Sequence, residues 1–144
     1  MGTEVMGKVT VSAVLENQDD LVLVRKGLLA PDAVRRVEVF DALIDSGATG
    51  LLVPRSLVMA LGLEPLRVRT ARTANGMVTH QVYHQVQLTV QGRDCRMDVG
   101  EVSDDLPVII CQLPLEAMDW VIDMRGHKLI GNPDHGGVQM MDII

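Results

Sequence analysis

The sequence predicts a single all-β domain with one or two short helices. Apolar and polar residues alternate from residue 78 to residue 90, which is the period of two of a β-strand. Asn75-Gly76, just before this stretch, is a strong signal for a tight hairpin, so residues 67–74 are expected to pair with it in an antiparallel manner. The other apolar runs are short and end at turn residues, as is typical of all-β domains.

In the first half of the chain, strands are expected at four apolar or β-branched stretches, residues 8–15, 21–24, 34–44 and 51–53. The turn residues at 17–20 predict that the first two of these strands form a hairpin. Pro54 is typical of a helix start and Gly62 of a helix end, so a short helix is expected over residues 55–61.

In the second half, the turn at Gln91-Gly92 precedes further strands, expected at residues 95–99, 106–110, 120–124, 128–130 and 138–144. Residues 115–118 are expected to be helical, and residues 132–137 to form a loop. Residues 40–61 and 106–120 form a weak internal repeat, because each runs from a strand through a tight turn and a proline to a short helix. No linker divides the chain, so residues 1–144 are expected to form one domain.

The composition excludes several classes of partner. The net charge is -6, the basic residues are scattered, and the aromatic residues are Phe40, Tyr83 and Trp120 alone, so neither nucleic acid nor an anionic membrane is an expected partner. No stretch is long and apolar enough to cross a membrane, and the expected location is the cytoplasm. Cys95 and Cys111 are expected to be reduced thiols.

No metal ion or other cofactor is expected. His80 and His84 are four residues apart, which on a strand corresponds to about 13 Å, too far for both to bind one ion. The glycines are dispersed and form no phosphate-binding loop. No motif pairs a serine or cysteine nucleophile with a histidine.

The most informative residue is an acid at the end of an apolar strand. Asp45 follows Ala42-Leu43-Ile44 directly and precedes Ser46-Gly47, and a second apolar run begins at Leu51. A lone carboxylate buried at such a place is costly unless it is hydrogen-bonded, paired or protonated. Asp45 is therefore expected to have a partner.

The run Ala42-Leu43-Ile44-Asp45-Ser46-Gly47-Ala48-Thr49 resembles the active-site signature of the retropepsin-like aspartic proteases. The resemblance continues through Pro54 and Leu61-Gly62-Leu63, and residues 107–110 and 114–116 resemble the second half of that family, especially its bacterial members. In the order and kind of elements it covers about residues 8–133. The fold it implies is a closed or partly open β-barrel with a flap hairpin and one or two short helices.

The resemblance implies an aspartic endopeptidase. Two carboxylates about 3 Å apart share one proton, so that one can activate a water molecule while the other protonates the substrate. Because one chain supplies one such residue, catalytic Asp45 is expected to face its copy in a homodimer whose terminal strands contribute to the interface. Ser46 is implied to form a hydrogen bond across the dimer axis. Gly47 is implied to allow close approach of the backbone and to contact the substrate.

Asn75-Gly76 falls where the family has its flap, a mobile β-hairpin that closes over an extended polypeptide substrate. Such a substrate is expected to bind as an added strand. The expected substrate contacts are Thr49, Asn75, Gly76 and Met77. An ordinary surface hairpin is the alternative interpretation of Asn75-Gly76.

The sequence departs from the family at one position near the expected site. The family usually has two apolar residues and then glycine in its second half, whereas this chain has Ile109-Ile110-Cys111. The side chain of Cys111 could crowd the loop beneath Asp45, which bears on catalysis more than on the fold. Two alternatives to an active protease therefore stay open: an inactive dimeric peptide-binding or scaffold module with the same fold, and a monomeric β-domain in which Asp45 only caps a turn.

Overall fold

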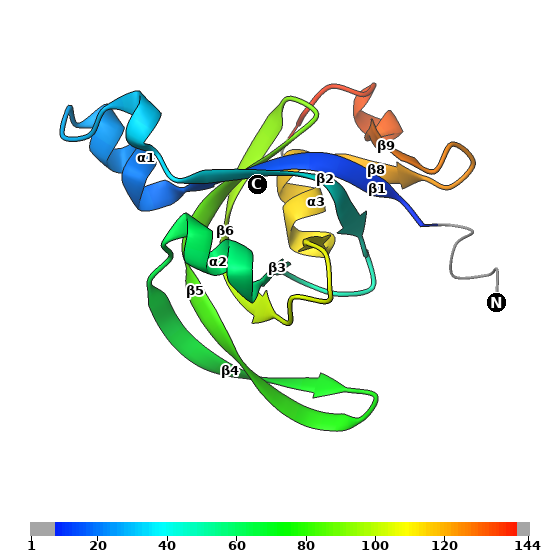
Figure 1. The fold of residues 1–144 in the computed structure, drawn as a ribbon. Coiled ribbons are helices and arrows are strands. Elements are labelled where there is room, and N and C mark those ends of the chain that lie inside the picture. Colours follow the sequence, from blue (N-terminus) through cyan, green and yellow to red (C-terminus); the bar gives the residue numbers. More distant parts are fainter. Residues whose placement is uncertain (1–7, 141–144) are drawn as a thin grey trace, which may run out of the picture.

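The computed structural model describes residues 8–140 and places about half of them in strands (Figure 1). The strands within this range are β1 Thr10–Asn17, β2 Arg36–Ile44, β3 Leu51–Pro54, β4 Pro65–Thr73, β5 Gly76–Val90, β6 Arg93–Val102, β7 Ile109–Ile110, β8 Trp120–Asp123 and β9 Lys128–Gly131. The helices are α1 Gln18–Arg25, α2 Arg55–Leu61 and α3 Gln112–Met118, with single 3-10 turns η1 Pro31–Ala33 and η2 Pro133–His135. The predicted all-β class is confirmed, with three short α-helices in place of one or two.

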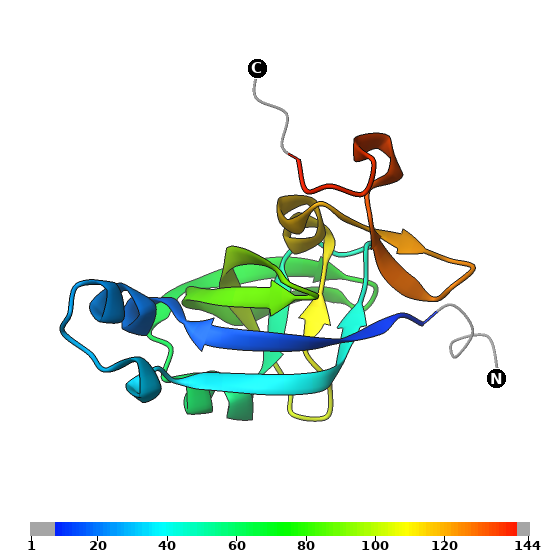
Figure 2. The same ribbon diagram turned by 90° about the horizontal axis from the view of Figure 1, so that it is seen from above.

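Six of the strands close into a barrel. Strand β1 pairs with β2 on one side and with β5 on the other, which closes the ring β1-β2-β7-β3-β6-β5. Strand β4 pairs with β5 outside this ring, and β8 and β9 form a separate two-stranded sheet (Figure 2). Alternate residues of the ring strands point inward and form an aliphatic core, for example Ala13 and Leu15 of β1 and Val86, Leu88 and Val90 of β5.

The predicted hairpin at residues 17–24 is wrong, because these residues form α1. Asn17 caps the helix, since its side-chain oxygen accepts a hydrogen bond from the Asp20 N–H at 3.1 Å. Asp19 and Asp20 lie in the first turn and Arg25 in the last, where their charges complement the helix dipole. The apolar run at 21–24 fits a short strand or a helix equally well, and the cap decides for the helix.

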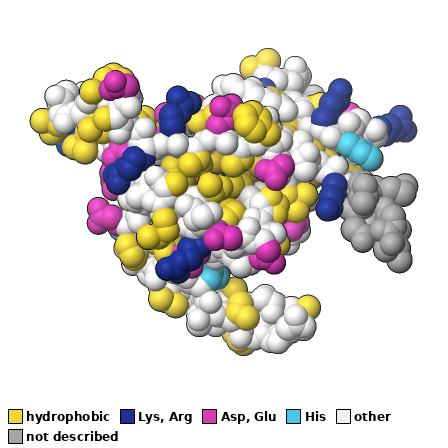
Figure 3. All heavy atoms as spheres, viewed as in Figure 1, with side chains coloured by type: hydrophobic (Ala, Val, Ile, Leu, Met, Phe, Trp, Pro, Cys, Tyr) yellow, Lys and Arg dark blue, Asp and Glu magenta, His cyan; other side chains and the backbone are white. Residues whose placement is uncertain are grey.

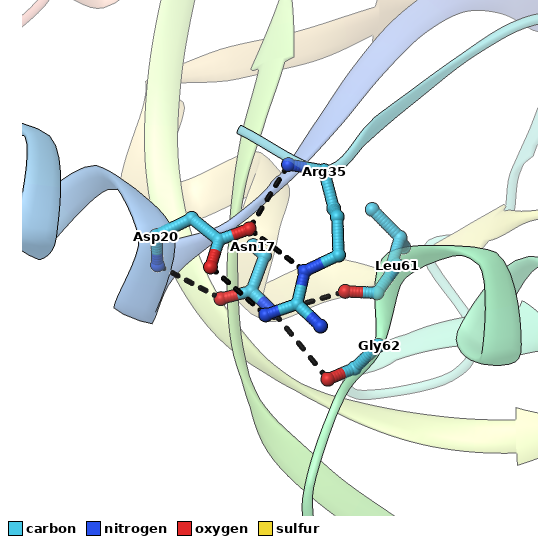
Figure 4. Close-up of polar contacts among 5 residues, drawn as sticks. All are labelled: Asn17, Asp20, Arg35, Leu61 and Gly62. Atoms are coloured by element: carbon cyan, nitrogen blue, oxygen red, sulfur yellow. Dashed lines mark hydrogen bonds and ion pairs between the residues drawn. The ribbon is translucent and has the colours of Figure 1, made fainter. Parts of the chain in front are cut away.

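A polar network joins α1 to the start of β2 and the end of α2 (Figure 4). Asp20 Oδ2 accepts hydrogen bonds from the Arg35 backbone N–H and from Arg35 Nε, and Asp20 Oδ1 accepts one from Arg35 Nη2, each at 2.9 Å. The hydrogen bonds from Arg35 hold the pKa of Asp20 below its usual value. The Asn17 side-chain amide donates to the Leu61 carbonyl at 2.9 Å and to the Gly62 carbonyl at 3.5 Å. The network therefore fixes three segments that are distant in sequence.

Most other expected elements are present. Helix α2 has the expected bounds and ends at Gly62, whose φ of 62° is left-handed. The β4–β5 hairpin forms as predicted, and the strands expected at 120–124 and 128–130 pair as β8 and β9. The first copy of the predicted repeat contains β2, the turn and α2 in the expected order, with β3 between the turn and the helix. In the second copy α3 begins at Gln112, so most of the expected turn belongs to the helix. The strand predicted over 106–110 is limited to β7, and η2 lies in the predicted loop.

The strand predicted at the C-terminal end of the chain is not seen in the part of it that the structure describes. Residues 138–140 are not in a strand, and the rest of the strand predicted for 138–144 lies outside the described residues. No helix within residues 8–140 is long and apolar enough to cross a membrane.

Candidate active site

The loop that carries Asp45 lies between β2 and β3 and is held by the start of α3. The Asp45 N–H donates to the Ile110 carbonyl at 2.9 Å. Three further backbone N–H groups, from residues 111, 112 and 113, donate to the carbonyls of Gly50 at 3.0 Å, Ala48 at 3.0 Å and Thr49 at 2.8 Å. Four hydrogen bonds therefore tie the Asp45 loop to residues 110–113 and fix the backbone around Asp45.

The Asp45 side chain is exposed in the single chain, and not buried as its position after a buried strand suggested. Its Oδ1 accepts a hydrogen bond from the Gly47 N–H at 3.0 Å. Ser46 and Thr49, which were predicted from the sequence, lie on the same loop and are also exposed. The carboxylate is thus presented to solvent on a fixed loop, where a partner from outside the chain could reach it.

Gly47 leaves little space beside this carboxylate. A Cβ atom at residue 47 would lie 3.2 Å from Asp45 Oδ1. We expect Gly47→Ala to displace the carboxylate and to lower any cleavage rate by about 10- to 100-fold. The stability should be nearly unchanged, because residue 47 is exposed and its φ is not left-handed.

Gly50→Ala is the matched control for this variant, because a Cβ atom at residue 50 would meet nothing within 4 Å. Cleavage kinetics and thermal melting of both variants give the test. Equal rates for Gly47→Ala and the parent chain would show that the position of the carboxylate is not critical.

Cys111, which stands where the family usually has glycine, is fully buried. Its φ of -106° and ψ of -164° are extended and open to any residue, and its N–H still binds the Gly50 carbonyl. Burial raises the pKa of the Cys111 thiol to about 11, and the negative charge of Asp45 adds to the rise. The side chain is therefore accommodated without loss of the loop's hydrogen bonds.

Both cysteines are expected to resist alkylation in the folded protein. Neither forms a disulfide, and burial also raises the pKa of Cys95 to about 11. Because the thiolate is the reactive form, we expect almost no labelling by iodoacetamide at about pH 8 and complete labelling in denaturant, measured by mass spectrometry. Rapid labelling of Cys111 in the native protein would contradict the buried site.

The predicted contacts Asn75, Gly76 and Met77 lie at the tip of the β4–β5 hairpin, which projects from the body as an arm (Figures 1 and 3). Thr73 Oγ1 donates to the Gly76 carbonyl at 2.8 Å, and the Asn75 N–H donates to Thr73 Oγ1 at 3.2 Å. Gly76 has a φ of 110°, which favours glycine. Among residues 8–140, no hydrogen bond or ion pair joins this tip to the Asp45 loop.

A row of half-buried aliphatic residues lies on the face of the barrel opposite to the core. Leu43 is adjacent to Ile109 in register, and Ile109 is adjacent to Leu52. Leu52 is in turn adjacent to Gly100 in register, and the side chain of His80, at the root of the arm, lies over Gly100. A Cβ atom at residue 100 would lie 2.9 Å from Leu52 Cδ2 and 3.3 Å from His80 Nε2. The row therefore begins two residues before Asp45 and ends beneath the arm.

A cavity of about 460 Å³ opens at the root of the arm, where Figure 3 shows basic, acidic and histidine side chains together. It is lined by Arg55, Thr79, His80, Gln81, Glu101, Val102, Ser103 and Asp104. Nothing in the sequence marked this cavity, because its residues come from three segments of the chain.

The acids of the cavity already have partners. Glu101 accepts a hydrogen bond from the Tyr83 hydroxyl at 2.6 Å and forms an ion pair with Arg55 at 3.4 Å. The bond to Glu101 raises the pKa of Tyr83. Asp104 accepts a hydrogen bond from the Ser56 N–H at the start of α2, at 2.8 Å, which lowers the pKa of Asp104. No group of three or more metal-ligating side chains occurs in the described part of the chain.

Comparison with known proteins assigns the chain to a family. A sequence model described as "Aspartyl protease" matches residues 34–117, more than half of the chain, including the Asp45 loop, the arm and all but the last residue of α3. Among solved structures, the solution structure of simian foamy virus (mac) protease is similar with 21% identity and a TM-score of 0.46, over 74% of this chain and 90% of that one. No curated protein matches. The chain belongs to the aspartyl protease family, as its resemblance to the retropepsin-like aspartic proteases predicted.

Proposed function

We propose that this chain is an aspartic endopeptidase that works as a homodimer, with one Asp45 from each subunit. The observation that supports this most directly is the exposed Asp45 carboxylate on a loop held by four backbone hydrogen bonds. A single chain offers one carboxylate at this place, and the mechanism needs two. A second copy of the chain, brought face to face with the first, supplies the second carboxylate. The cytoplasmic location of the protein stays a prediction.

The chemistry follows from two carboxylates that share one proton. The ionised carboxylate takes a proton from a water molecule, whose oxygen attacks the scissile carbonyl carbon. The protonated carboxyl gives its proton to the carbonyl oxygen, so a neutral tetrahedral intermediate forms. As it collapses and the C–N bond breaks, the carboxyl that took the proton from water gives it to the leaving nitrogen. The other carboxylate takes a hydroxyl proton from the intermediate, so the pair again holds one proton. Because the pair must hold one proton, we expect maximal activity at mildly acidic pH.

The other predicted site residues take supporting roles in this proposal. Ser46 braces the two loops across the dimer axis, and Gly47 leaves room for the carboxylate and the substrate backbone. Thr49 contacts the substrate from the loop. The backbone at Asn75, Gly76 and Met77 closes over the substrate as a flap. This role is supported by the exposure of these three residues at the tip of the arm.

The proposal is tested with a diverse peptide library between about pH 4 and pH 7, with new termini identified by mass spectrometry. Light scattering on the same sample should give about twice the chain mass of 15.7 kDa. Cleavage by a dimer supports the proposal. A folded dimer that cuts nothing would favour an inactive peptide-binding module, for which Cys111 is the motivating departure. A monomer would contradict the proposal.

A further inference from the structure

The β4–β5 arm has a charge opposite to that of the whole chain. Residues 65–90 contain three arginines, two histidines and no Asp or Glu, whereas the chain as a whole has 13 basic and 19 acidic residues. Arg69 forms none of the ion pairs found among residues 8–140. The arm therefore carries unneutralised positive charge on a negatively charged protein.

Arg69 lies on the face of the arm that is turned toward the body. Arg67, two residues earlier and so on the same face, forms an ion pair with Asp98 of β6, with Nη1 and Oδ2 3.7 Å apart. Arg69 is paired in register with His80, whose ring lies over Gly100 of β6. Side chains of such a register pair are close neighbours on one face. Arg69 and His80 therefore lie together between the arm and the body.

The acids of the cavity that His80 lines, and the acid that binds Arg67, are already engaged. Asp98 pairs with Arg67, Glu101 with Tyr83 and Arg55, and Asp104 with the Ser56 N–H. The side chains of Arg69 and His80 have no hydrogen-bonding or ionic partner in the described part of the chain. An added carboxylate would therefore find a free guanidinium here, which can bind both carboxylate oxygens.

We propose that Arg69, with His80 beside it, binds a carboxylate of the substrate, so that the preferred substrates are polypeptides with Asp or Glu near the scissile bond. This inference rests on the proposed function, because it places the substrate between the arm and the body. An extended substrate that runs from the Asp45 loop beneath the arm passes over Leu52 and reaches Arg69 at the root. The acidic residue of the substrate is therefore expected a few positions away from the scissile bond, and not at one of the two residues that the bond joins.

The first test compares matched peptides at about pH 5.5, where substrate carboxylates are still ionised. Each acidic peptide that is cleaved is remade with Gln for Glu or Asn for Asp, one position at a time. We expect one position at which the amide lowers kcat/KM by about tenfold, mainly through a higher KM. Equal cleavage of the acidic and amide peptides at every position would overturn the inference and leave the proposed function standing.

The second test uses variants. Arg69→Gln should remove the preference for the acidic peptide, and Arg69→Glu should reverse it in favour of a peptide with Lys at that position. Arg25→Gln is the matched control, because Arg25 is exposed at the end of α1 and its loss changes the net charge equally. A preference retained in Arg69→Gln, or lost equally in Arg25→Gln, would contradict a role for Arg69.

Binding measurements separate this inference from the proposed function. If the parent chain cleaves no peptide, the proposed function fails, and fluorescence anisotropy with labelled acidic peptides and their amide forms still tests recognition. Tighter binding of the acidic form that depends on Arg69 supports the inference. Equal binding of both forms, or binding of a single-stranded RNA but of neither peptide, would overturn it.

Discussion

Asp45→Asn is expected to remove peptide cleavage and to leave the fold unchanged. The amide cannot share a proton with the other Asp45 or act as a base toward water, so kcat/KM should fall by about 10³-fold or more. The fold should persist because the side chain is exposed, and the Gly47 N–H can still donate to the amide oxygen. Cleavage kinetics and thermal melting of the purified variant measure the two effects.

Asp41→Asn is the control for this variant. Asp41 is an exposed acid on β2, four residues before Asp45, and its replacement changes the net charge by the same amount. We expect it to retain nearly full activity. Substantial cleavage by Asp45→Asn would show that another group does the chemistry, and equal losses in both variants would point to a general effect of charge.

Asp20→Ala is expected to lower the free energy of unfolding by about 2–4 kcal/mol. The Asp20 side chain is 6% exposed and holds both the backbone and the guanidinium of Arg35. Its loss leaves the Arg35 N–H without its acceptor and releases the start of β2 from α1. Arg35 is 51% exposed, so water can solvate its charge, which keeps the effect below that of a fully buried pair. Urea unfolding measures the difference.

Asp19→Ala is the matched control, since Asp19 lies in the same first turn but is exposed. It should change the stability by about 0.5 kcal/mol or less. A comparably large loss in Asp19→Ala, or none in Asp20→Ala, would contradict the account of the network.

The same ion pair predicts how stability depends on pH. The hydrogen bonds from Arg35 lower the pKa of Asp20 in the folded state below its usual value of 3.8. The pair therefore contributes its full stability above that value and loses it as the pH falls through the folded pKa. Unfolding curves below about pH 4 should show this loss in the parent chain and a smaller loss in Asp20→Ala. Parallel pH profiles for the two proteins would show that Asp20 does not contribute in this way.

The parts of the fold that the sequence predicted well are those with strong local signals. The alternation at 78–90 and Asn75-Gly76 identify the hairpin, while Pro54 and Gly62 mark the two ends of α2. The first helix was missed because an apolar run of four residues has no distinct period. What fixes α1 is an Asn17 cap and an Asp20–Arg35 pair fifteen residues apart, and such a contact leaves no local pattern.

In the candidate site, too, the features with a local sequence signal could be predicted and those that depend on distant contacts could not. Asp45, Ser46 and Gly47 are consecutive and carry a family motif, so the sequence alone could name them as candidates, and their roles stay predictions. Their exposure could not be predicted, because it depends on how α3 packs beneath the loop. The pair of Arg69 and His80 depends on the register of two strands and on contact with β6, which become visible only in the folded chain.

Subunit mixing tests the central claim, that one site needs Asp45 from two chains, most directly. The parent chain, held at a fixed concentration, is incubated with increasing amounts of Asp45→Asn until subunits have exchanged, and cleavage is then measured. Random pairing predicts that an equal amount of Asp45→Asn lowers the activity to about half, and a threefold excess to about a quarter, because mixed dimers lack one carboxylate. Activity that stays constant or rises as Asp45→Asn is added, with mixed dimers demonstrated by mass spectrometry, would show that one Asp45 suffices and would contradict the shared site.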